Sequence, residues 1–334
     1  MKRHITFILI ALLFPYCGRR AQQAPSSPSG ASHSAPSAMI VEIPERAIYY
    51  WKSVFKLNDY ETEFLKGHDI STLYIKMFDA APDHDWNTGE TGVFPVATTK
   101  FLSVVPEGIK VVPTVYITLE ATLRSAGKEE DLAEKIVTRI LAMVSFNELG
   151  PVEMVQFDCD WTASTRDSYF ALCRRAREIL GEKGILLSGT VRLHQVAEPE
   201  YPFDHRVLML YNTGSIKNPD TRNSIIDYDE VKKYLKRGKC QHSFDMAYPI
   251  FGWTVNFKDG QFTGLTHGTN PDSLSYGPGE TFRIETSEIS EILKVKTLAD
   301  RAAENPPHSN IIYHLDSTNL SKYTFDEIER IYSD

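Results

Sequence analysis

The sequence predicts an α/β fold, a (β/α)8 TIM-type barrel formed by a single domain. Segments with the composition of strands alternate with helical segments, which implies parallel pairing because each crossover must return the chain to the same edge of the sheet. Eight strand segments are expected, the number that such a barrel needs. The alternative fold, an open doubly wound sheet, would more typically start with a Gly-rich phosphate-binding loop. The sequence contains no such loop. A chain of 334 residues with 42% hydrophobic residues is long enough for one large core.

The strands are indicated by short runs that are rich in β-branched and aromatic residues. We expect them at residues 47–55, 72–79, 110–118, 153–161, 185–194, 206–213, 243–250 and 310–317. Helical spacing of apolar residues marks the segments between several of these strands. We expect helices at residues 59–67, 128–146, 168–180, 229–237, 287–293 and 324–331.

Local sequence signals support the start of the first helix, the end of the third helix and one additional hairpin. Asn58 or Asp59 is a typical N-cap for the first helix, and Gly181 is a typical end for the third. Residues 251–265 predict a hairpin with an Asp-Gly turn that extends from the seventh strand over the carboxyl-end face. Trp253 and Phe257 form either one wall of a cleft or the small core of the hairpin itself.

The segment 153–161 organises the rest of the barrel. In a strand, its side chains alternate between two faces. The apolar face carries Val155, Phe157 and Cys159, and the opposite face carries Gln156, Asp158 and Asp160. The segment is therefore expected to lie under helices on one side and to present two carboxylates on the other.

Asp158 and Asp160 are two residues apart, which places them about 7 Å from each other along a strand. Two carboxylates at this range, shielded from water, raise the pKa of at least one of them, and such a group can act as an acid near neutral pH. The alternative is a buried ion-pair network in which Arg192 or Lys76 is the partner, since structural networks also perturb carboxylates.

Active sites of such barrels form at the carboxyl ends of the strands. The polar candidates at the expected strand ends are Asp79, Glu120, Asp158, Asp160, Arg192, His194, Tyr211, Asn212, Asp245, Tyr248, His314 and Asp316. Lone histidines at such positions serve more often as scaffold than as bases. Arg192 is expected either to pair with a carboxylate inside the barrel or to hold an acidic sugar.

Aromatic side chains near strand ends and loops favour a sugar ligand, because flat rings stack on the apolar faces of pyranose rings. The candidates are Trp51, Trp86, Trp161, Trp253 and Tyr248. The alternative for Trp51 and Trp161 is that they pack beneath helices, since tryptophan is highly buried on average.

Composition argues against several other ligands. The formal net charge of −8 gives no electrostatic footprint for nucleic acid. No cysteine pair has zinc-ligand spacing, so neither a metal nor another cofactor is expected. Cys159 and Cys173 are interpreted as small buried hydrophobic residues, and a disulfide among Cys159, Cys173 and Cys240 remains an open alternative.

The N-terminal residues 1–21 predict an export signal. Lys2 and Arg3 precede a short apolar run at residues 5–14, too short for an ordinary membrane span. Cys17 follows that run, so the alternatives are a lipoprotein with a lipid anchor on Cys17 and free secretion. Residues 22–40 form a flexible tether rich in Ser, Pro and Ala, and the barrel follows at 41–334. The expected location is the cell envelope, in the periplasm or at the outer membrane.

Two short motifs resemble those of family-18 chitinases. The segment 157–162, Phe-Asp-Cys-Asp-Trp-Thr, resembles the fourth-strand motif that ends Asp-x-Asp-Trp-Glu. The segment 209–212, Met-Leu-Tyr-Asn, resembles the sixth-strand motif Met-x-Tyr-Asp/Asn. Residues 150–195 are more similar to an exported bacterial family of unknown function that is related to glycoside-hydrolase barrels. This resemblance implies a barrel that acts on or binds a glycan.

Thr162 departs from the chitinase motif, since the family's proton-donating glutamate stands at this position. The family mechanism therefore does not apply to this sequence. One hypothesis is a glycoside hydrolase in which Asp160 is the acid and Glu120, Asp79 or Asp245 is the base or nucleophile. The second hypothesis is a non-catalytic barrel that binds glycans, and the third is a structural or assembly lipoprotein of the envelope.

Overall fold

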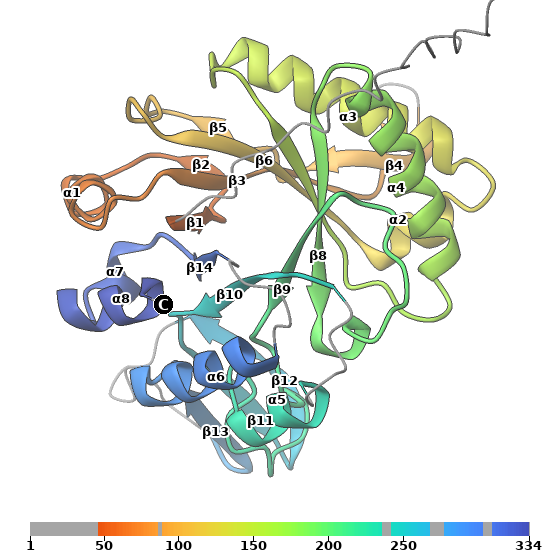
Figure 1. Cartoon of the computed structure of the whole chain (residues 1–334). Coiled ribbons are helices and arrows are strands. Elements are labelled where there is room, and N and C mark those ends of the chain that lie inside the picture. Colours follow the sequence, from red (N-terminus) through yellow and green to blue (C-terminus); the bar gives the residue numbers. More distant parts are fainter. Residues whose placement is uncertain (1–45, 86–88, 236–241, 268–276, 303–308, 334) are drawn as a thin grey trace, which may run out of the picture. The chain divides into compact units, whose positions relative to one another are not determined.

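Eight parallel strands form a closed barrel in the part of the chain that the computed structural model describes, which is residues 46–85, 89–235, 242–267, 277–302 and 309–333. Around the barrel the strands are β1 (Arg46–Tyr50), β3 (Thr72–His84), β6 (Lys110–Ile117), β7 (Met154–Asp158), β8 (Leu186–Arg192), β9 (His205–Met209), β10 (Asp245–Pro249) and β14 (Asn310–Tyr313). β14 pairs with β1 and closes the ring (Figure 1). The predicted fold class is confirmed.

Helices cover the outside of the barrel (Figure 1). They are α1 (Asp59–Gly67), α2 (Leu119–Arg124), α3 (Glu129–Phe146), α4 (Arg166–Gly181), the 3-10 turn η1 (Leu193–Gln195), α5 (Tyr228–Tyr234), α6 (Ile289–Ala302), α7 (Ser317–Leu320) and α8 (Phe325–Tyr332). α1 begins as predicted, with Asn58 as its N-cap and Glu61 completing a capping box. The short elements α2, η1 and α7 were not predicted, because one or two turns carry too little periodicity.

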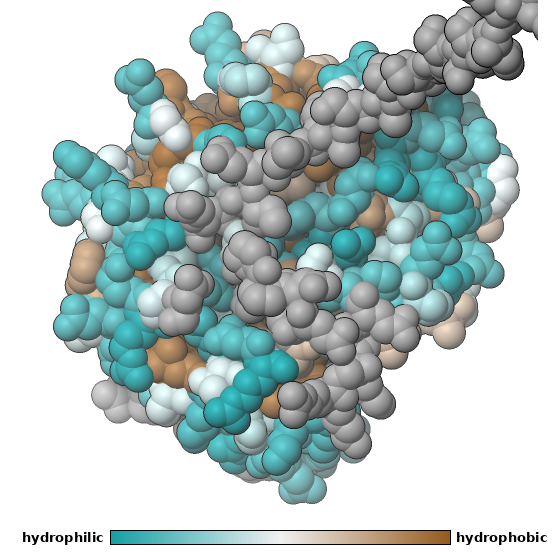
Figure 2. Space-filling model, in the orientation of Figure 1, coloured by the Kyte–Doolittle hydropathy of each residue, from teal (hydrophilic) through white to brown (hydrophobic). Residues whose placement is uncertain are grey.

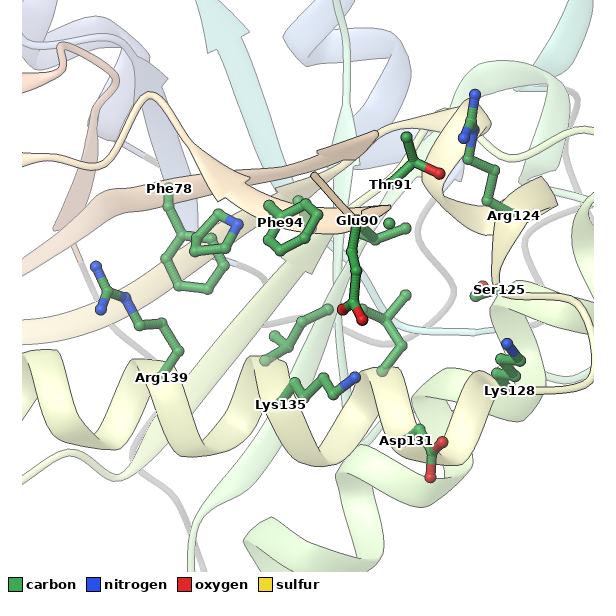
Figure 3. A pocket seen from close by; sticks show the side chains of 16 residues that line it. Phe78, Glu90, Thr91, Phe94, Arg124, Ser125, Lys128, Asp131, Lys135 and Arg139 are labelled. Atoms are coloured by element: carbon green, nitrogen blue, oxygen red, sulfur yellow. The ribbon is translucent and has the colours of Figure 1, made fainter. Parts of the chain in front are cut away.

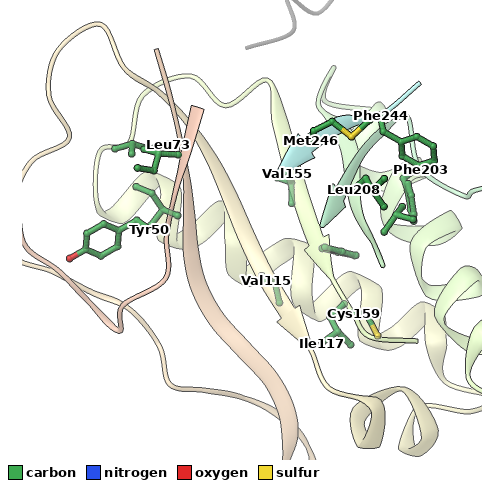
Figure 4. Close-up of a cluster of buried hydrophobic side chains, with 14 of the residues drawn as sticks. Tyr50, Leu73, Val115, Ile117, Val155, Cys159, Phe203, Leu208, Phe244 and Met246 are labelled. Atoms are coloured by element: carbon green, nitrogen blue, oxygen red, sulfur yellow. The ribbon is translucent and has the colours of Figure 1, made fainter. Parts of the chain in front are cut away.

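The apolar residues form two layers. The outer layer lies between strands and helices and includes Val155, Phe157 and Cys159 of the β7 segment. Figure 4 shows Val155 and Cys159 in this layer. The inner layer fills the barrel and includes Tyr49, Tyr74 and other residues that share their strand face. The predicted alternation along β7 is therefore confirmed, and both faces of its strand are buried, as is usual in parallel sheets.

β3 extends beyond the barrel and pairs there with β4 (Thr91–Val96) in antiparallel register. The register of β3 with β6 shifts between Lys76 and Phe78, so that Asp79, like Lys76 before the shift, lies on the inner face. Two short strands, β2 (Val54–Phe55) and β5 (Lys100–Phe101), form a separate pair. The expected first strand thus ends at Tyr50, and its last residues belong to this second sheet.

A three-stranded antiparallel sheet follows the carboxyl end of β10. It consists of β11 (Trp253–Lys258), β12 (Gln261–His267) and β13 (Glu280–Glu285), with β11 in the middle. Asp259 and Gly260 join β11 to β12 with φ angles of 48° and 75°, as a type I′ turn requires. The predicted hairpin is confirmed, whereas the third strand was not predicted. Phe257 is 3% exposed and belongs to the core of this small sheet.

Several predicted features lie outside the described residues. They are the export signal at 1–21 with Cys17, the tether at 22–40, Trp86 and Cys240. Cys159 and Cys173 are buried free thiols, as the sequence indicated. In the described ranges, no helix combines the length and the hydropathy that crossing a bilayer requires. On the face shown in Figure 2, hydrophobic residues appear as separate areas among hydrophilic ones.

Candidate functional site at the carboxyl-end mouth of the barrel

One guanidinium holds both carboxylates of the β7 segment. Arg192, the last residue of β8, donates from Nη2 to Oδ1 of Asp158 at 3.1 Å and from Nε to Oδ1 of Asp160. Thr190 on the same strand donates its hydroxyl to Oδ1 of Asp158 at 2.5 Å. Asp158 is buried at 3% exposure, whereas the side chain of Asp160, which follows the strand, is 45% exposed. The ion-pair network with Arg192 is therefore present.

Burial dominates the electrostatics of Asp158. Removal from water raises the pKa of the Asp158 carboxyl, Arg192 lowers it, and the nearby charges of Asp160 and Asp79 raise it, with a net upward shift. Burial lowers the pKa of the Arg192 guanidinium, but Asp158, Tyr211 and Asp160 together outweigh this effect and hold the pKa well above the ordinary value. Arg192 therefore stays charged inside the barrel.

Lys76 does not form an ion pair with Asp158. It pairs with Asp79, which lies on the same strand. Nζ of Lys76 lies 3.1 Å from Oδ1 of Asp79. The register shift in β3 makes this pair possible, because it brings two residues three positions apart onto the same face. Lys76 is 7% exposed, so the pair is largely withdrawn from solvent. Asp79 thus contributes a second carboxylate to the electrostatics of Asp158, and this carboxylate already has a cation.

A row of aromatic side chains, which we call the aromatic belt, follows the ends of β1, β9, β10 and β14. It consists of Trp51, Tyr211, Phe251, Trp253 and Tyr313. The ring centroids of Trp51 and Tyr313 are 5.6 Å apart, those of Tyr313 and Tyr211 4.8 Å, and those of Phe251 and Trp253 5.2 Å. Four of these side chains are partly exposed, and Tyr211 is buried.

The belt meets the charged cluster at Tyr211. The guanidinium carbon of Arg192 lies 5.6 Å from the centroid of the Tyr211 ring, within the range of a cation–π interaction. Burial raises the pKa of the Tyr211 hydroxyl, so this group remains a neutral phenol at physiological pH. The charged cluster therefore adjoins the belt through the buried ring of Tyr211, and the other four belt side chains are partly exposed, an arrangement suited to a ligand with hydroxyl groups and apolar faces.

Trp161 and His194 follow their strands, as predicted, but do not contact the ion-pair network of Arg192. Trp161 is 5% exposed and packs edge-on against Phe170 of α4, with 5.2 Å between the ring centroids. Its carbonyl oxygen accepts a hydrogen bond from Gln195 at 2.8 Å. The alternative that Trp161 packs beneath a helix is therefore the one observed. His194 of η1 is exposed and has its Nε2 atom 3.4 Å from the same carbonyl oxygen.

Three further candidates lie apart from the ion-pair network. Asn212 is exposed and adopts a left-handed φ of 54°, which asparagine tolerates better than most residues. Glu120 is exposed in the first turn of α2. Asp316 is the N-cap of α7 and lies 3.1 Å from Nζ of Lys52. Burial raises the pKa of Asp316, but the hydrogen bond and charge of Lys52, together with Asn319 and His314, outweigh this effect and lower the pKa.

The expected positions of Asp245 and Tyr248 are wrong. Asp245 is the first residue of β10, so it lies at the amino end of the barrel, opposite the mouth. Tyr248 belongs to the outer apolar layer, with no exposed surface. Asp245 stands near the start of the strand, which is the amino end, and residues three apart on a strand lie on opposite faces, so Tyr248 points toward the helices when Asp245 points inward.

Asp245 belongs to a polar network inside the amino end of the barrel. Its Oδ2 lies 3.0 Å from Nε2 of His205, and Nδ1 of His205 lies 3.2 Å from Oγ of Ser188. Gln156 joins Ser188 to Tyr49 through hydrogen bonds of 3.1 and 2.8 Å. A Ser-His-Asp series of this kind resembles a catalytic triad only in its distances, because Ser188 has no exposed surface. The amino end of such a barrel supports stability.

The sequence analysis missed Thr190, Phe251 and Tyr313, and it named Lys76 only as a possible partner of the β7 carboxylates and not of Asp79. Alternation counted from the apolar residues of β8 and β14 would have placed Thr190 and Tyr313 on the inner face. The Lys76–Asp79 pair depends on a register shift that leaves no signal in the sequence. In the described ranges, no three His, Cys, Asp or Glu side chains gather in a group that could hold a metal ion.

The barrel shares its fold with glycan-degrading enzymes of known structure. The spore cortex-lytic enzyme SleL of Bacillus cereus is 14% identical, with a TM-score of 0.53 over 86% of this chain and 73% of that one. A chitinase from Bacteroides thetaiotaomicron is 14% identical, with a TM-score of 0.52 over 87% of this chain and 97% of that one. The Group IV chitinase of Ostrinia furnacalis is 10% identical, with a TM-score of 0.50 over 87% and 98%. Neither a protein-family model nor a curated protein matches the sequence.

Proposed function

We propose that this barrel binds a glycan at its carboxyl-end mouth and does not cleave it. The observation that carries the proposal is that Arg192 holds Asp158 and Asp160 together beside the aromatic belt. A binding site for a sugar needs partly exposed aromatic faces and fixed polar groups, and both occur here. The likeness to chitinases and to a spore cortex-lytic enzyme supports a glycan as the ligand class.

The charged cluster supports binding better than catalysis. A glycosidase of the usual kind needs a protonated carboxyl group that faces the glycosidic oxygen and a second carboxylate across the cleft. Asp160 accepts a hydrogen bond from Arg192, Asp79 is paired with Lys76, and Thr162 offers only a hydroxyl group. These groups can hydrogen-bond sugar hydroxyls, but none of them is an unpaired acid.

Glycoside hydrolysis is the second candidate, and one observation favours it. Burial raises the pKa of Asp158, which is the direction that a general acid requires. A route through Asp158 has a geometric cost, because this carboxyl group is 3% exposed and its Oδ1 already accepts from Thr190 and Arg192. It would have to be uncovered before it could reach a substrate.

The test uses the purified protein on chitin, on soluble N-acetylglucosamine oligosaccharides and on bacterial cell-wall glycan, with binding and reducing-end release measured in parallel. Wild type is compared with Asp158→Asn and Asp160→Asn. We expect at least one glycan to bind without release, and Asp160→Asn to weaken that binding because Asp160 is the exposed carboxylate. Release by wild type that disappears in Asp158→Asn would replace the proposal by the second candidate. No binding to any glycan would overturn both.

We also propose that the protein is exported and carries a lipid on Cys17, which places it in the cell envelope. The support is the apolar run at residues 5–14, the position of Cys17 directly after it, and the tether at 22–40. Metabolic labelling with a fatty acid, followed by fractionation, tests this point. Label in wild type and none in Cys17→Ser is the expected result. Unlabelled wild type in the soluble fraction would indicate free secretion.

A further inference from the structure

A cleft on the outer flank of the barrel, which we call the flank cleft, lies between β4 and α3 (Figure 3). Its volume is about 680 Å³, which falls within the range of ligand-binding pockets. Apolar residues from both sides line it, namely Phe78 of β3, Val93 and Phe94 of β4, and Leu132 and Ile136 of α3. The flank cleft is separate from the ion-pair network and the aromatic belt, with which it shares no residue.

Four cationic side chains line the flank cleft: Arg124, Lys128, Lys135 and Arg139. None of them forms an ion pair with a carboxylate of the described residues. By contrast, Glu134 on the same helix pairs with Arg175 of α4 at 2.6 Å. Glu90 and Asp131 also line the cleft, so the four cations exceed the carboxylates there by two. An excess of positive charge in a protein of net charge −8 is a local feature that fits an anion.

The cations follow a line along α3. Lys128 is the N-cap of α3, Lys135 follows it after seven residues and Arg139 after a further four, spacings that return to nearly the same helix face. At about 1.5 Å rise per residue, they span about 16 Å, with intervals of about 10 and 6 Å. A ligand with one anionic head would meet only part of this line. A ligand with repeated negative charges would meet all of it.

We propose that the flank cleft binds a linear anionic oligosaccharide, such as a chain of carboxylated sugars. Its carboxylates would lie against Lys128, Lys135 and Arg139, and the apolar faces of its rings against Val93 and the partly exposed Phe94. This site is independent of the glycan proposed for the mouth.

The experiment measures the affinity of oligogalacturonate hexamers by calorimetry at low and at physiological salt, with a neutral galactose oligosaccharide as the comparison ligand. The variants are the double substitution Lys135→Gln/Arg139→Gln and, as a matched control, Arg174→Gln/Lys183→Gln, which removes two exposed cations from the α4 segment. Trp51→Ala tests the mouth separately. Thermal unfolding of each variant shows whether it is folded.

We expect the anionic hexamer to bind more tightly than the neutral one and to weaken with salt. Lys135→Gln/Arg139→Gln should weaken binding by about tenfold, which is what two exposed charge contacts can supply. The control double variant and Trp51→Ala should bind as wild type does, which separates this site from the mouth. Absence of binding, or equal binding by both double variants, would overturn the proposal. Binding of anionic lipid vesicles in place of the hexamer, with the same dependence on Lys135 and Arg139, would overturn it in favour of a lipid.

Discussion

The Nη2 atom of Arg192 on β8 lies 3.1 Å from Oδ1 of Asp158 on β7, inside a barrel where Asp158 is 3% exposed. A buried ion pair of this kind is costly to break from one side only, because the remaining charge keeps its desolvation penalty without its partner. The relationship therefore makes the two residues energetically dependent on each other.

This dependence gives the first prediction. Arg192→Gln should lower the free energy of unfolding by about 3 kcal/mol, because Asp158 loses its cation. Asp158→Asn in the same chain should recover part of that loss. Urea unfolding of wild type, both single variants and the double variant measures the coupling. Losses that simply add, to within about 0.5 kcal/mol, would show that the pair is not coupled.

The second prediction concerns pH and Asp158. Its pKa in the folded state lies above the ordinary value, so over the intervening pH range the folded protein holds a proton that the unfolded chain has released. The stability that Asp158 contributes is therefore fully present below the ordinary pKa and is lost as pH rises through the folded-state pKa. The unfolding free energy of wild type, minus that of Asp158→Asn, should fall as pH rises over this window.

Asp316 provides the matched comparison, because its pKa is lowered. The sign is then reversed: the contribution of Asp316 is present above its ordinary pKa and is lost as pH falls through the folded-state pKa. The difference between wild type and Asp316→Asn should rise with pH. The same sign of pH dependence in both variants would contradict the assignment.

The third prediction separates stability from binding. Asp245→Asn at the amino end of the barrel should weaken the contact with His205, which is 3.0 Å away, and lower stability by about 1–3 kcal/mol. Because the mouth lies at the opposite ends of the strands, glycan affinity should remain that of wild type. Urea unfolding and a binding assay on the same samples measure the two quantities. Lost affinity in a fully folded Asp245→Asn protein would place Asp245 in the binding site after all.

The fourth prediction concerns Gly189 of β8. A Cβ atom at this position would lie 2.5 Å from the ring of Phe203, which is itself 2% exposed. Gly189→Ala should therefore cost about 1–3 kcal/mol of stability through overpacking. Gly181→Ala is the control, since a Cβ there meets nothing within 4 Å. Equal thermal stability of the two variants would show that the ring of Phe203 moves aside without cost.

The sequence predicted the barrel because its evidence is repetitive. Eight strands contribute the same signal, and an error of a few residues in one strand leaves the topology unchanged. The local pattern around Asp158 was equally informative, since alternation alone places Val155 and Phe157 under helices and Asp158 inside. The pairing of Arg192 with a carboxylate inside the barrel, expected from the sequence as one of two alternatives, is also present.

Single residues were harder to place than strands. Asp245 was assigned to the mouth although it stands near the start of the expected strand at 243–250, and Tyr248 was grouped with it although residues three apart on a strand lie on opposite faces. The Lys76–Asp79 pair follows from a register shift, and the aromatic belt combines residues from four strands that are far apart in sequence. Such features depend on tertiary packing, which local periodicity does not encode.

The central claim is that the aromatic belt binds a glycan without cleaving it. Calorimetric titration of wild type, Trp51→Ala and Phe146→Ala with the glycan that wild type binds most tightly tests this claim most directly. Trp51 belongs to the belt, and Phe146 is an aromatic residue that is 86% exposed at the end of α3. The account predicts at least about a tenfold loss of affinity for Trp51→Ala, the scale of one aromatic contact, and wild-type affinity for Phe146→Ala. Unchanged affinity of Trp51→Ala, or continuous release of reducing ends during the titration of wild type, would contradict it.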